Sequence, residues 1–231
     1  MNLRFTGILA ISLIAALGLA GCHCGPTQTA KAKPAAPAAT TSAAEPDVDH
    51  LFDGRSLDGW RVTDFAGKGQ VEVKNGELIL NEAVMTGVNY TNPVPTVNFE
   101  INLDACRRSG SDFFCGLTFP VQKSHCTFIV GGWGGGTVGI SSIDSMDASE
   151  NDTTAFLSFE NGKWYHIRVR VTATKIEAWI DDKQTANVDY RDKVISLRPG
   201  EIEESKPLGI ATWATTGVLK NITLTHLPAA K

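Results

Sequence analysis

Apolar and polar residues alternate along short segments of this 231-residue chain, and this pattern limits the fold more than any other feature of the sequence. Residues 97–104 read Val-Asn-Phe-Glu-Ile-Asn-Leu-Asp, and residues 165–171 read Tyr-His-Ile-Arg-Val-Arg-Val. Successive side chains of a β-strand point to opposite faces, so each segment predicts a strand with one buried face. Asn75-Gly76 separates two further strand-like segments, and both residues tolerate the positive φ of a tight hairpin turn.

No long segment has the periodicity of a helix, and we expect a single helical turn, at residues 192–197. Many short strands separated by Gly, Asn and Asp turns predict an all-β domain, a β-sandwich or jelly roll. Residues 49–231 have the length of one such domain.

The first 21 residues predict an export signal. Arg4 supplies a positive charge, and residues 8–19 form an apolar run that is too short to span a bilayer. Leu19-Ala20-Gly21-Cys22 follows, and this motif is typical of the site at which bacterial lipoproteins are cleaved and lipidated. We therefore predict a lipoprotein signal peptide at residues 1–21 with lipid on Cys22, the alternative being an ordinary secretory signal with a chance cysteine. The expected location is the bacterial envelope, facing the periplasm or the cell surface.

Residues 22–48 predict a disordered, lipidated tether rich in Ala, Pro and Thr. Between Thr27 and Pro46 the chain has no large apolar residue, so it cannot bury enough surface to offset the entropy of ordering. The formal net charge is −4 and no run of basic residues is present, which argues against nucleic-acid binding. We expect contact with the membrane through the lipid anchor only.

The segment Leu-Phe-Asp-Gly-Arg-Ser-Leu-Asp-Gly-Trp at residues 51–60 resembles the opening of the 3-keto-disaccharide hydrolase domain family. The similarity continues at residues 73–78, 99–101, 162–165, 178–181, 208–210 and 219–222. The resemblance implies a concanavalin- or laminin-G-like jelly roll that cleaves or hydrates glycosides carrying a ketone at C3. Such a ketone acidifies the C2 hydrogen, so an enzyme needs a base at C2 and an electropositive group at the carbonyl oxygen.

The resemblance transfers no catalytic residue, because the middle of the chain departs from the family pattern. The family pattern has an Asn-Ser-Gly step that leads to an Arg in the next strand, and a Glu-x-Gln strand then follows. Residues 108–117 read Arg-Ser-Gly-Ser-Asp-Phe-Phe-Cys-Gly-Leu, and residues 126–130 contain no carboxylate. Asp112 in this segment is a candidate base, or an ordinary turn residue.

Trp133 is the main candidate for sugar binding. It is flanked by five glycines within residues 131–136, so it has no local packing partner. Its indole can stack on a sugar face or fold back into the core, and the sequence leaves both open. Trp213 is a second candidate. The remaining tryptophans, Trp60, Trp164 and Trp179, lie in strand-like or family segments, and we expect them in the core.

Residues 143–152 carry four carboxylates in one predicted loop. Asp144 and Glu150 are candidate general bases, and Asp144 and Asp147 are candidate ligands for Ca²⁺ or another divalent cation. The alternative is a solvated acidic loop without a ligand.

The sequence leaves the pairing of three cysteines open. Cys106, Cys115 and Cys126 allow three single disulfides in an oxidising envelope, or remain buried thiols. It also leaves three functions open: an enzyme acting on keto-glycosides, a non-catalytic carbohydrate-binding module, and a structural or protein-binding lipoprotein. The expected ligand in the first two cases is a carbohydrate.

Overall fold

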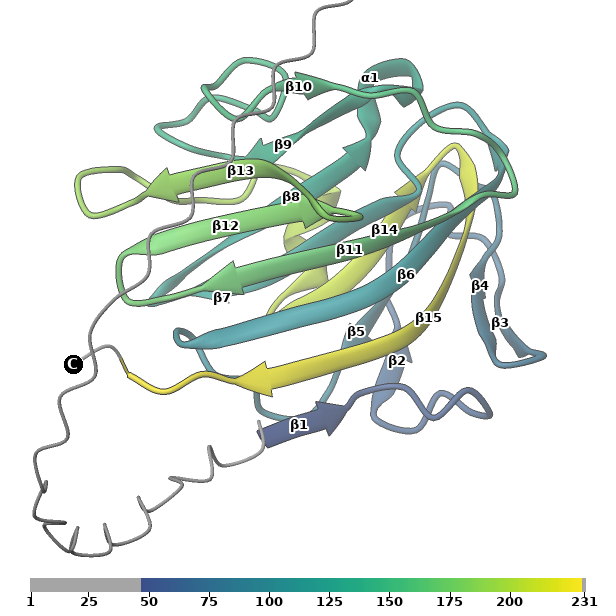
Figure 1. Cartoon of the computed structure of the whole chain (residues 1–231). Coiled ribbons are helices and arrows are strands. Elements are labelled where there is room, and N and C mark those ends of the chain that lie inside the picture. Colours follow the sequence, from purple (N-terminus) through teal and green to yellow (C-terminus); the bar gives the residue numbers. More distant parts are fainter. Residues whose placement is uncertain (1–46, 230–231) are drawn as a thin grey trace, which may run out of the picture. The chain divides into compact units, whose positions relative to one another are not determined.

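The computed structural model describes residues 47–229, and within them two antiparallel sheets pack face to face (Figure 1). This arrangement confirms the predicted β-sandwich. The predicted signal peptide, Cys22 and residues 22–46 of the predicted tether lie outside the described residues. Among those described, no helix combines the length and the hydrophobicity of a membrane-spanning segment.

Sheet A has the strand order β13-β12-β11-β6-β15-β4-β3, with β1 paired to β15. Its strands are β1 (Asp47–His50), β3 (Val71–Lys74), β4 (Glu77–Leu80), β6 (Phe99–Gly110), β11 (Trp164–Val171), β12 (Lys175–Ile180), β13 (Lys183–Asp189) and β15 (Thr215–His226).

Sheet B has the strand order β10-β9-β8-β7-β14-β5-β2. Its strands are β2 (Trp60–Val62), β5 (Met85–Tyr90), β7 (Cys115–Val121), β8 (Ser124–Gly131), β9 (Thr137–Ser141), β10 (Ala155–Phe156) and β14 (Leu208–Trp213). A short turn, α1 (Gly132–Gly135), joins β8 to β9, and a 3₁₀ helix, η1 (Glu201–Ser205), precedes β14.

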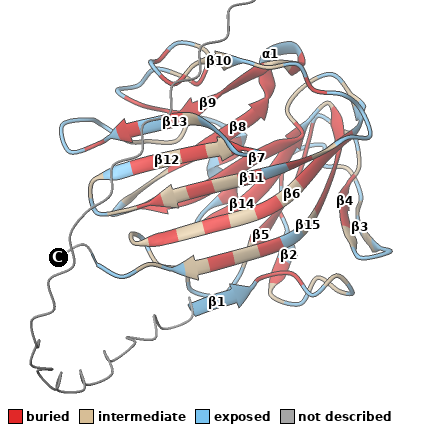
Figure 2. Cartoon of the chain, in the orientation of Figure 1, coloured by how far each residue is buried: buried red, intermediate tan, exposed pale blue. Residues whose placement is uncertain are grey.

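The core lies between the sheets and takes alternate residues of their central strands (Figure 2). In β6 the alternation predicted from sequence holds, since Phe99, Ile101 and Leu103 are buried and the residues between them are not. Each large apolar side chain removed from water in this way contributes about 1.5–3 kcal/mol. The predicted hairpin is also present, because Asn75 and Gly76 have φ values of 55° and 82° between β3 and β4.

The N-terminal strand begins before the expected domain boundary. Asp47 and Val48, placed in the tether by composition, belong to β1, where Asp47 pairs with His226 of β15. Composition does not detect this strand because all four residues of β1 are exposed. Backbone pairing, rather than burial, attaches it to sheet A.

The predicted helical turn at residues 192–197 is wrong, and η1 lies further along the chain. The main chain of this segment pairs with residues 142–144 instead. The N–H of Ser142 donates to the carbonyl of Ser196, and the N–H of Asp144 donates to that of Val194. These contacts hold the segment against sheet B and occupy the groups that a helix would need.

Two of the three tryptophans expected in the core lie on the outer face of sheet A. Trp60 is buried, and its indole N–H donates to the carbonyl of Leu51 at 2.7 Å. Trp164 and Trp179 are half-buried, with the Lys220 ammonium 4.0 Å and the Arg168 guanidinium carbon 4.0 Å from the respective ring centroids. The core prediction for these two is wrong because smaller residues of β11 and β12 occupy the inward positions.

All three described cysteines are buried free thiols, so the structure supports that alternative over a disulfide. Cys115 and Cys126 lie in adjacent strands but out of register, because Cys115 pairs with Val130 and Cys126 with Phe119. Burial raises the pKa of the Cys115 thiol to about 12, and it also raises the pKa values of Cys126 and Cys106.

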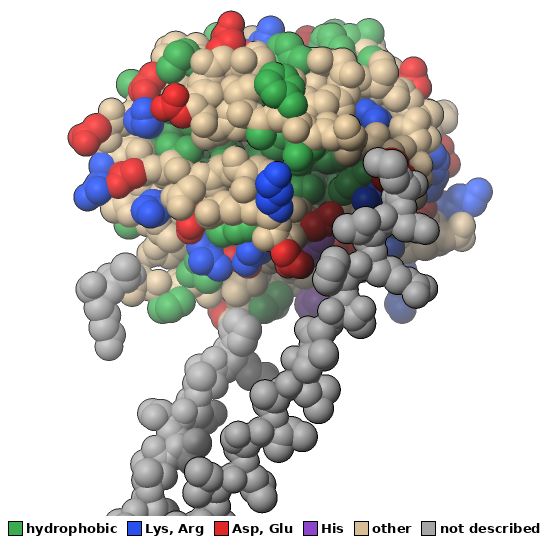
Figure 3. Space-filling model, turned by 45° about the horizontal axis from the view of Figure 1, so that its top comes forward, with side chains coloured by type: hydrophobic (Ala, Val, Ile, Leu, Met, Phe, Trp, Pro, Cys, Tyr) green, Lys and Arg blue, Asp and Glu red, His purple; other side chains and the backbone are tan. Residues whose placement is uncertain are grey.

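Acidic and basic side chains are interspersed on the face drawn in Figure 3, without a patch of one sign. Sheet A carries several ion pairs. Arg170 lies 2.8 Å from Glu100, and Arg108 lies 2.8 Å from Glu77.

Candidate functional site

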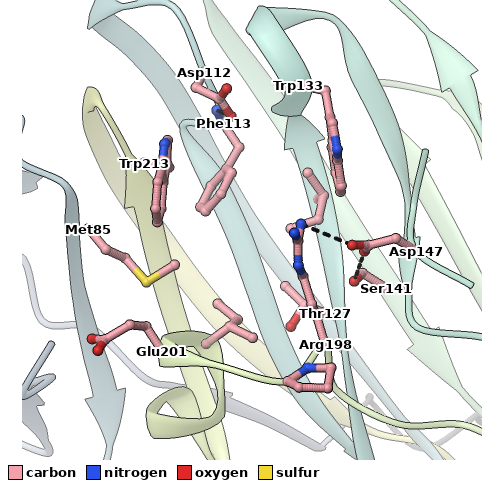
Figure 4. Close-up of a pocket in the computed structure, with 13 residues that line it drawn as sticks. Met85, Asp112, Phe113, Thr127, Trp133, Ser141, Asp147, Arg198, Glu201 and Trp213 are labelled. Carbon is pink, nitrogen blue, oxygen red and sulfur yellow. Dashed lines mark hydrogen bonds and ion pairs between the residues drawn. The ribbon is translucent and has the colours of Figure 1, made fainter. Parts of the chain in front are cut away.

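A cleft of about 410 Å³ opens on the outer face of sheet B (Figure 4). Strand alternation creates it, since Thr127 and Ile129 of β8 point away from the core between the inward residues Cys126, Phe128 and Val130. The lining comes from four strands, from α1 and η1, and from three loops: Met85, Asp112, Phe113, Thr127, Ile129, Trp133, Ser141, Asp147, Arg198, Pro199, Glu201, Ile202 and Trp213.

Two indoles form opposite sides of the cleft, with Phe113 between them (Figure 4). Trp133 and Trp213 are 43% and 40% exposed. Phe113 packs against a separate buried cluster that includes Met85 and Ile202. The cleft is therefore an apolar floor between two accessible aromatic walls.

Trp133 projects from the sheet because α1 is built from left-handed residues. Its φ is 48°, and Gly131, Gly134 and Gly135 have φ values of 82°, 86° and 103°. Glycine adopts such angles without a steric penalty, whereas a residue with a side chain does so rarely. The turn therefore presents one side chain, the indole, and the alternative of a Trp133 folded back into the core is absent from the structure.

Two polar side chains fix α1 in this conformation. The Oδ2 of Asp112 accepts a hydrogen bond from the Gly134 N–H at 3.0 Å, and its Oδ1 accepts one from the Phe113 N–H at 2.8 Å. On the other side of the turn, the buried Arg107 donates from Nη1 to the Gly135 carbonyl at 3.2 Å. The carboxylate of Asp112 thus joins the two aromatic residues Phe113 and Trp133 through the main chain.

Arg198 and Asp147 form an ion pair in the cleft, 3.0 Å between Nη1 and Oδ2 (Figure 4). Asp147 also accepts hydrogen bonds from the Ser141 hydroxyl and, at 3.0 Å, from the Ala148 N–H. The guanidinium carbon of Arg198 lies 5.8 Å from the centroid of Trp133, within cation–π range. Because the Arg198 side chain is 59% exposed, its remaining donors can reach a ligand.

The third carboxylate of the lining, Glu201, accepts a hydrogen bond from the Ala66 N–H at 2.8 Å. Each lining carboxylate, Asp112, Asp147 and Glu201, therefore already has a partner in the protein. The arrangement suits recognition by stacking and by hydrogen bonds from Arg198.

The model of the 3-keto-alpha-glucoside-1,2-lyase-like domain matches residues 47–225. The chain belongs to this family. A search of curated proteins found no match. Among solved structures, a protein from Parabacteroides distasonis assigned as a glycosyl hydrolase has a TM-score of 0.51 at 13% identity, covering 78% of this chain and 94% of that one. The Crh5 transglycosylase in complex with NAG has a TM-score of 0.53 at 12% identity, covering 82% and 86%. At these identities the two structures support the jelly-roll fold alone.

In this lyase-like domain, the residues predicted from sequence separate into two groups. Asp112, Trp133, Trp213 and Asp147 line the cleft together, although Asp147 was considered only as a metal ligand. Asp144 and Glu150, the other candidate bases, do not line it.

Asp144 instead ties its loop to the segment after β13. Its Oδ1 accepts the Val194 N–H at 2.8 Å, and its Oδ2 lies 3.2 Å from the Lys193 ammonium. The Val194 N–H, and then the Lys193 hydrogen bond, lower the pKa of Asp144 below its ordinary value. Glu150 is exposed, and its nearest donor is the Asp147 N–H at 3.5 Å. Residues 47–229 contain no group of three or more His, Cys, Asp or Glu residues placed to hold a metal ion, and the cation site stays a prediction.

Sequence reasoning missed Arg198, Ser141 and Phe113. Arg198 lies in an irregular segment with no periodicity, and only its pairing partner Asp147 had been singled out. Its one available signal is that Pro199 and Gly200 end an extended segment directly after it, which is common where a loop presents a side chain.

Proposed function

We propose that the cleft of this lyase-like domain binds a glycoside between Trp133 and Trp213. The two accessible indoles on opposite walls carry the proposal, because the apolar C–H face of a sugar ring stacks on an aromatic face. An apolar floor with a few fixed polar groups is also typical of small-ligand sites. Family membership points to the same ligand class, and a transglycosylase of the same fold has been solved with NAG.

Arg198 favours a sugar that carries a ketone over one that does not. Its guanidinium lies beside Trp133 with donors free of the Asp147 pair, and a carbonyl oxygen accepts from such a donor without offering a proton in return. We expect the domain to bind a methyl 3-keto-glucoside more tightly than the matching methyl glucoside. Arg198→Gln should remove most of this difference.

The test of binding is a pair of tryptophan variants. Trp133→Ala and Trp213→Ala should each weaken binding of methyl 3-keto-α-glucoside several-fold, since an aromatic contact contributes about 0.5–1.5 kcal/mol. Trp164→Ala is the matched control, because Trp164 is a half-buried tryptophan on the opposite sheet. Titration calorimetry measures affinity, and thermal melts confirm folding. Failure of wild-type protein to bind glucosides or 3-keto-glucosides, or a large loss of melting temperature in Trp133→Ala, would favour a structural lipoprotein instead.

A lyase reaction is the second candidate, favoured by the position of Asp147 beside Arg198 in a family of lyase-like domains. In this reaction Asp147 takes the C2 proton, and the C–H electrons form an enolate whose oxygen accepts a hydrogen bond from Arg198. The enolate then restores the C3 carbonyl and expels the C1 substituent, leaving a C1=C2 double bond. The departing oxygen takes a proton from water and leaves as an alcohol, and the hydroxide formed takes the C2 proton from Asp147, which restores the carboxylate.

Product analysis separates the two candidates. Wild-type protein acting as a lyase releases the alcohol and forms a conjugated enone that absorbs in the ultraviolet. Asp147→Asn should bind the same ligand but release no alcohol. Binding without any release by wild-type protein would assign the domain as a carbohydrate-binding module.

We further propose that the chain is an envelope lipoprotein anchored through Cys22. The motif Leu19-Ala20-Gly21-Cys22 supports this proposal. Cys22→Ser should leave a protein that no longer sediments with membranes or takes up a fatty-acid probe. Equal labelling of the variant and the parent would contradict it.

A further inference from the structure

Phe156 has the most exposed large hydrophobic side chain among residues 47–229, with 77% of its surface accessible. It lies in β10, the edge strand of sheet B, where Phe156 pairs with Thr137 and Ala155 pairs with Val138 of β9. Val138 is in the core and Ala155 packs against it. Residues paired directly in an antiparallel sheet share a face, and neighbours along a strand alternate, so Phe156 and Thr137 point to the outer face. This is the face on which the cleft opens.

Phe156 also lies close to the turn that carries Trp133. Thr137 forms a bridge to Gly132 on the side opposite Phe156, and the Leu157 N–H donates to the Gly136 carbonyl at 2.9 Å. Gly132 and Phe156 are therefore separated by two strand spacings, about 10 Å. Figure 1 shows α1 and β10 next to each other at one end of the sandwich.

The strip between Trp133 and Phe156 carries little polar side-chain surface. A Cβ added at Gly134 would meet no atom within 4 Å, and Thr137 is 3% exposed. Two hydroxyls lie two residues from Phe156 along the chain: that of Thr154 already donates toward the carbonyls of Ala148 and Asn151, and that of Ser158 is exposed. A ligand crossing this strip meets glycine backbone and then a phenyl ring, with the exposed hydroxyl of Ser158 two residues from that ring along the chain.

We infer that Phe156 is the platform for an apolar, aromatic aglycone attached to the sugar held between Trp133 and Trp213. The inference rests on the proposed function, because the sugar places the aglycone. An exposed phenyl ring with one exposed hydroxyl near it along the chain, that of Ser158, favours another apolar ring over a second, heavily hydroxylated sugar. In the lyase reaction the aglycone is the leaving group, so Phe156 selects which substituent at C1 is accepted.

The test compares two ligands that differ only in the aglycone, methyl and phenyl 3-keto-α-glucoside, on the full-length chain by titration calorimetry. Wild-type protein should bind the phenyl ligand about three- to tenfold more tightly, from the energy of one aromatic contact. Phe156→Ala should bind both ligands equally while keeping the wild-type affinity for the methyl ligand. Phe156→Tyr should retain the preference. Val194→Ala is the control, since Val194 is also an exposed hydrophobic residue, 63% accessible, and does not line the cleft.

Two outcomes would overturn the inference, and they differ from failure of the proposed function. Equal affinity of wild-type protein for both ligands, or a phenyl preference that survives in Phe156→Ala, removes the aglycone platform even if Trp133→Ala abolishes binding. Loss of binding to both ligands in wild-type protein removes the sugar site and the platform together. Because its side chain is mostly exposed, Phe156→Ala should fold, and unchanged thermal melts check this.

Discussion

At the level of single residues, the carboxylate of Asp112 fixes the position of Trp133 without touching its ring. Both oxygens accept main-chain hydrogen bonds, one of them from Gly134 within the turn. Asp112→Ala should therefore loosen α1 and reduce glycoside affinity almost as much as Trp133→Ala, with a stability loss of about 1–3 kcal/mol from the unpaired N–H groups. Asp112→Asn keeps an acceptor oxygen and should lose less.

Denaturant unfolding and ligand titration measure the two effects of Asp112 separately. Asp189→Asn is a suitable control, because Asp189 is an exposed carboxylate paired with Arg191 and does not line the cleft. If Asp112→Ala binds glycosides with wild-type affinity, the turn does not depend on this carboxylate.

The buried thiols of β7 and β8 give a second prediction at this scale. Only the thiolate reacts with alkylating agents, and burial raises the pKa of Cys115 to about 12 and that of Cys126 as well. At pH 8 both should stay unmodified by iodoacetamide in the folded protein and react fully in denaturant. Peptide mass spectrometry follows each cysteine by itself. Rapid labelling of Cys115 without denaturant would show that β7 opens locally.

At the level of elements, the sequence predicts where the strands lie better than it predicts which tryptophans of a strand face the core. The alternation at residues 165–171 predicts β11 because a two-residue period is a local property. Trp164 directly precedes this segment, and the alternation places its side chain on the outer face, although its size favoured a core assignment. In β12 the residues on both sides of Trp179, Ala178 and Ile180, take the inward positions and belong to the core. Size alone therefore did not identify the buried face.

The attachment of α1 to sheet A depends on Arg107 of β6. Its Nη1 donates to the Gly135 carbonyl, its Nη2 to the Phe159 carbonyl, and its Nε to Asn161 Oδ1 at 2.7 Å. Arg107→Met should destabilise the domain by roughly 3 kcal/mol, since each carbonyl left unpaired in the interior costs about 1–3 kcal/mol. Arg107→Lys, with a single ammonium, should recover part of this loss.

Guanidinium chloride unfolding measures this stability, and Arg108→Met is the control, because the neighbouring Arg108 forms an exposed pair with Glu77. The folded Arg107→Met protein should also bind glycosides more weakly, as the Gly135 anchor of the turn is gone. A loss of stability equal to that of Arg108→Met would mean that the three contacts of Arg107 contribute little.

At the level of the whole molecule, the cleft joins parts of the chain that no local pattern connects. Trp133 was predictable as a candidate because the glycines around it leave its indole without local packing partners, and Trp213 was a second candidate. Their placement on opposite walls follows from the order of β8, β7 and β14 in sheet B, which the sequence alone does not specify. Arg198 reaches the cleft because residues 194–196 pair with residues 142–144, a contact between irregular segments. Such long-range contacts lack a sequence period.

The two tryptophans should therefore act on one ligand ring as a unit, and a double-mutant cycle can measure this. If Trp133 and Trp213 enclose the same sugar, removing either wall loosens the ring, so the second wall contributes less once the first is gone. The affinity loss of the double alanine variant should then differ from the sum of the single losses by about 0.5–3 kcal/mol, the range of residues that share a partner. Titrations of methyl 3-keto-α-glucoside into the four proteins give the coupling free energy. Losses that add to within about 0.5 kcal/mol would place the two indoles on separate parts of the ligand, and the sugar would then occupy only one wall.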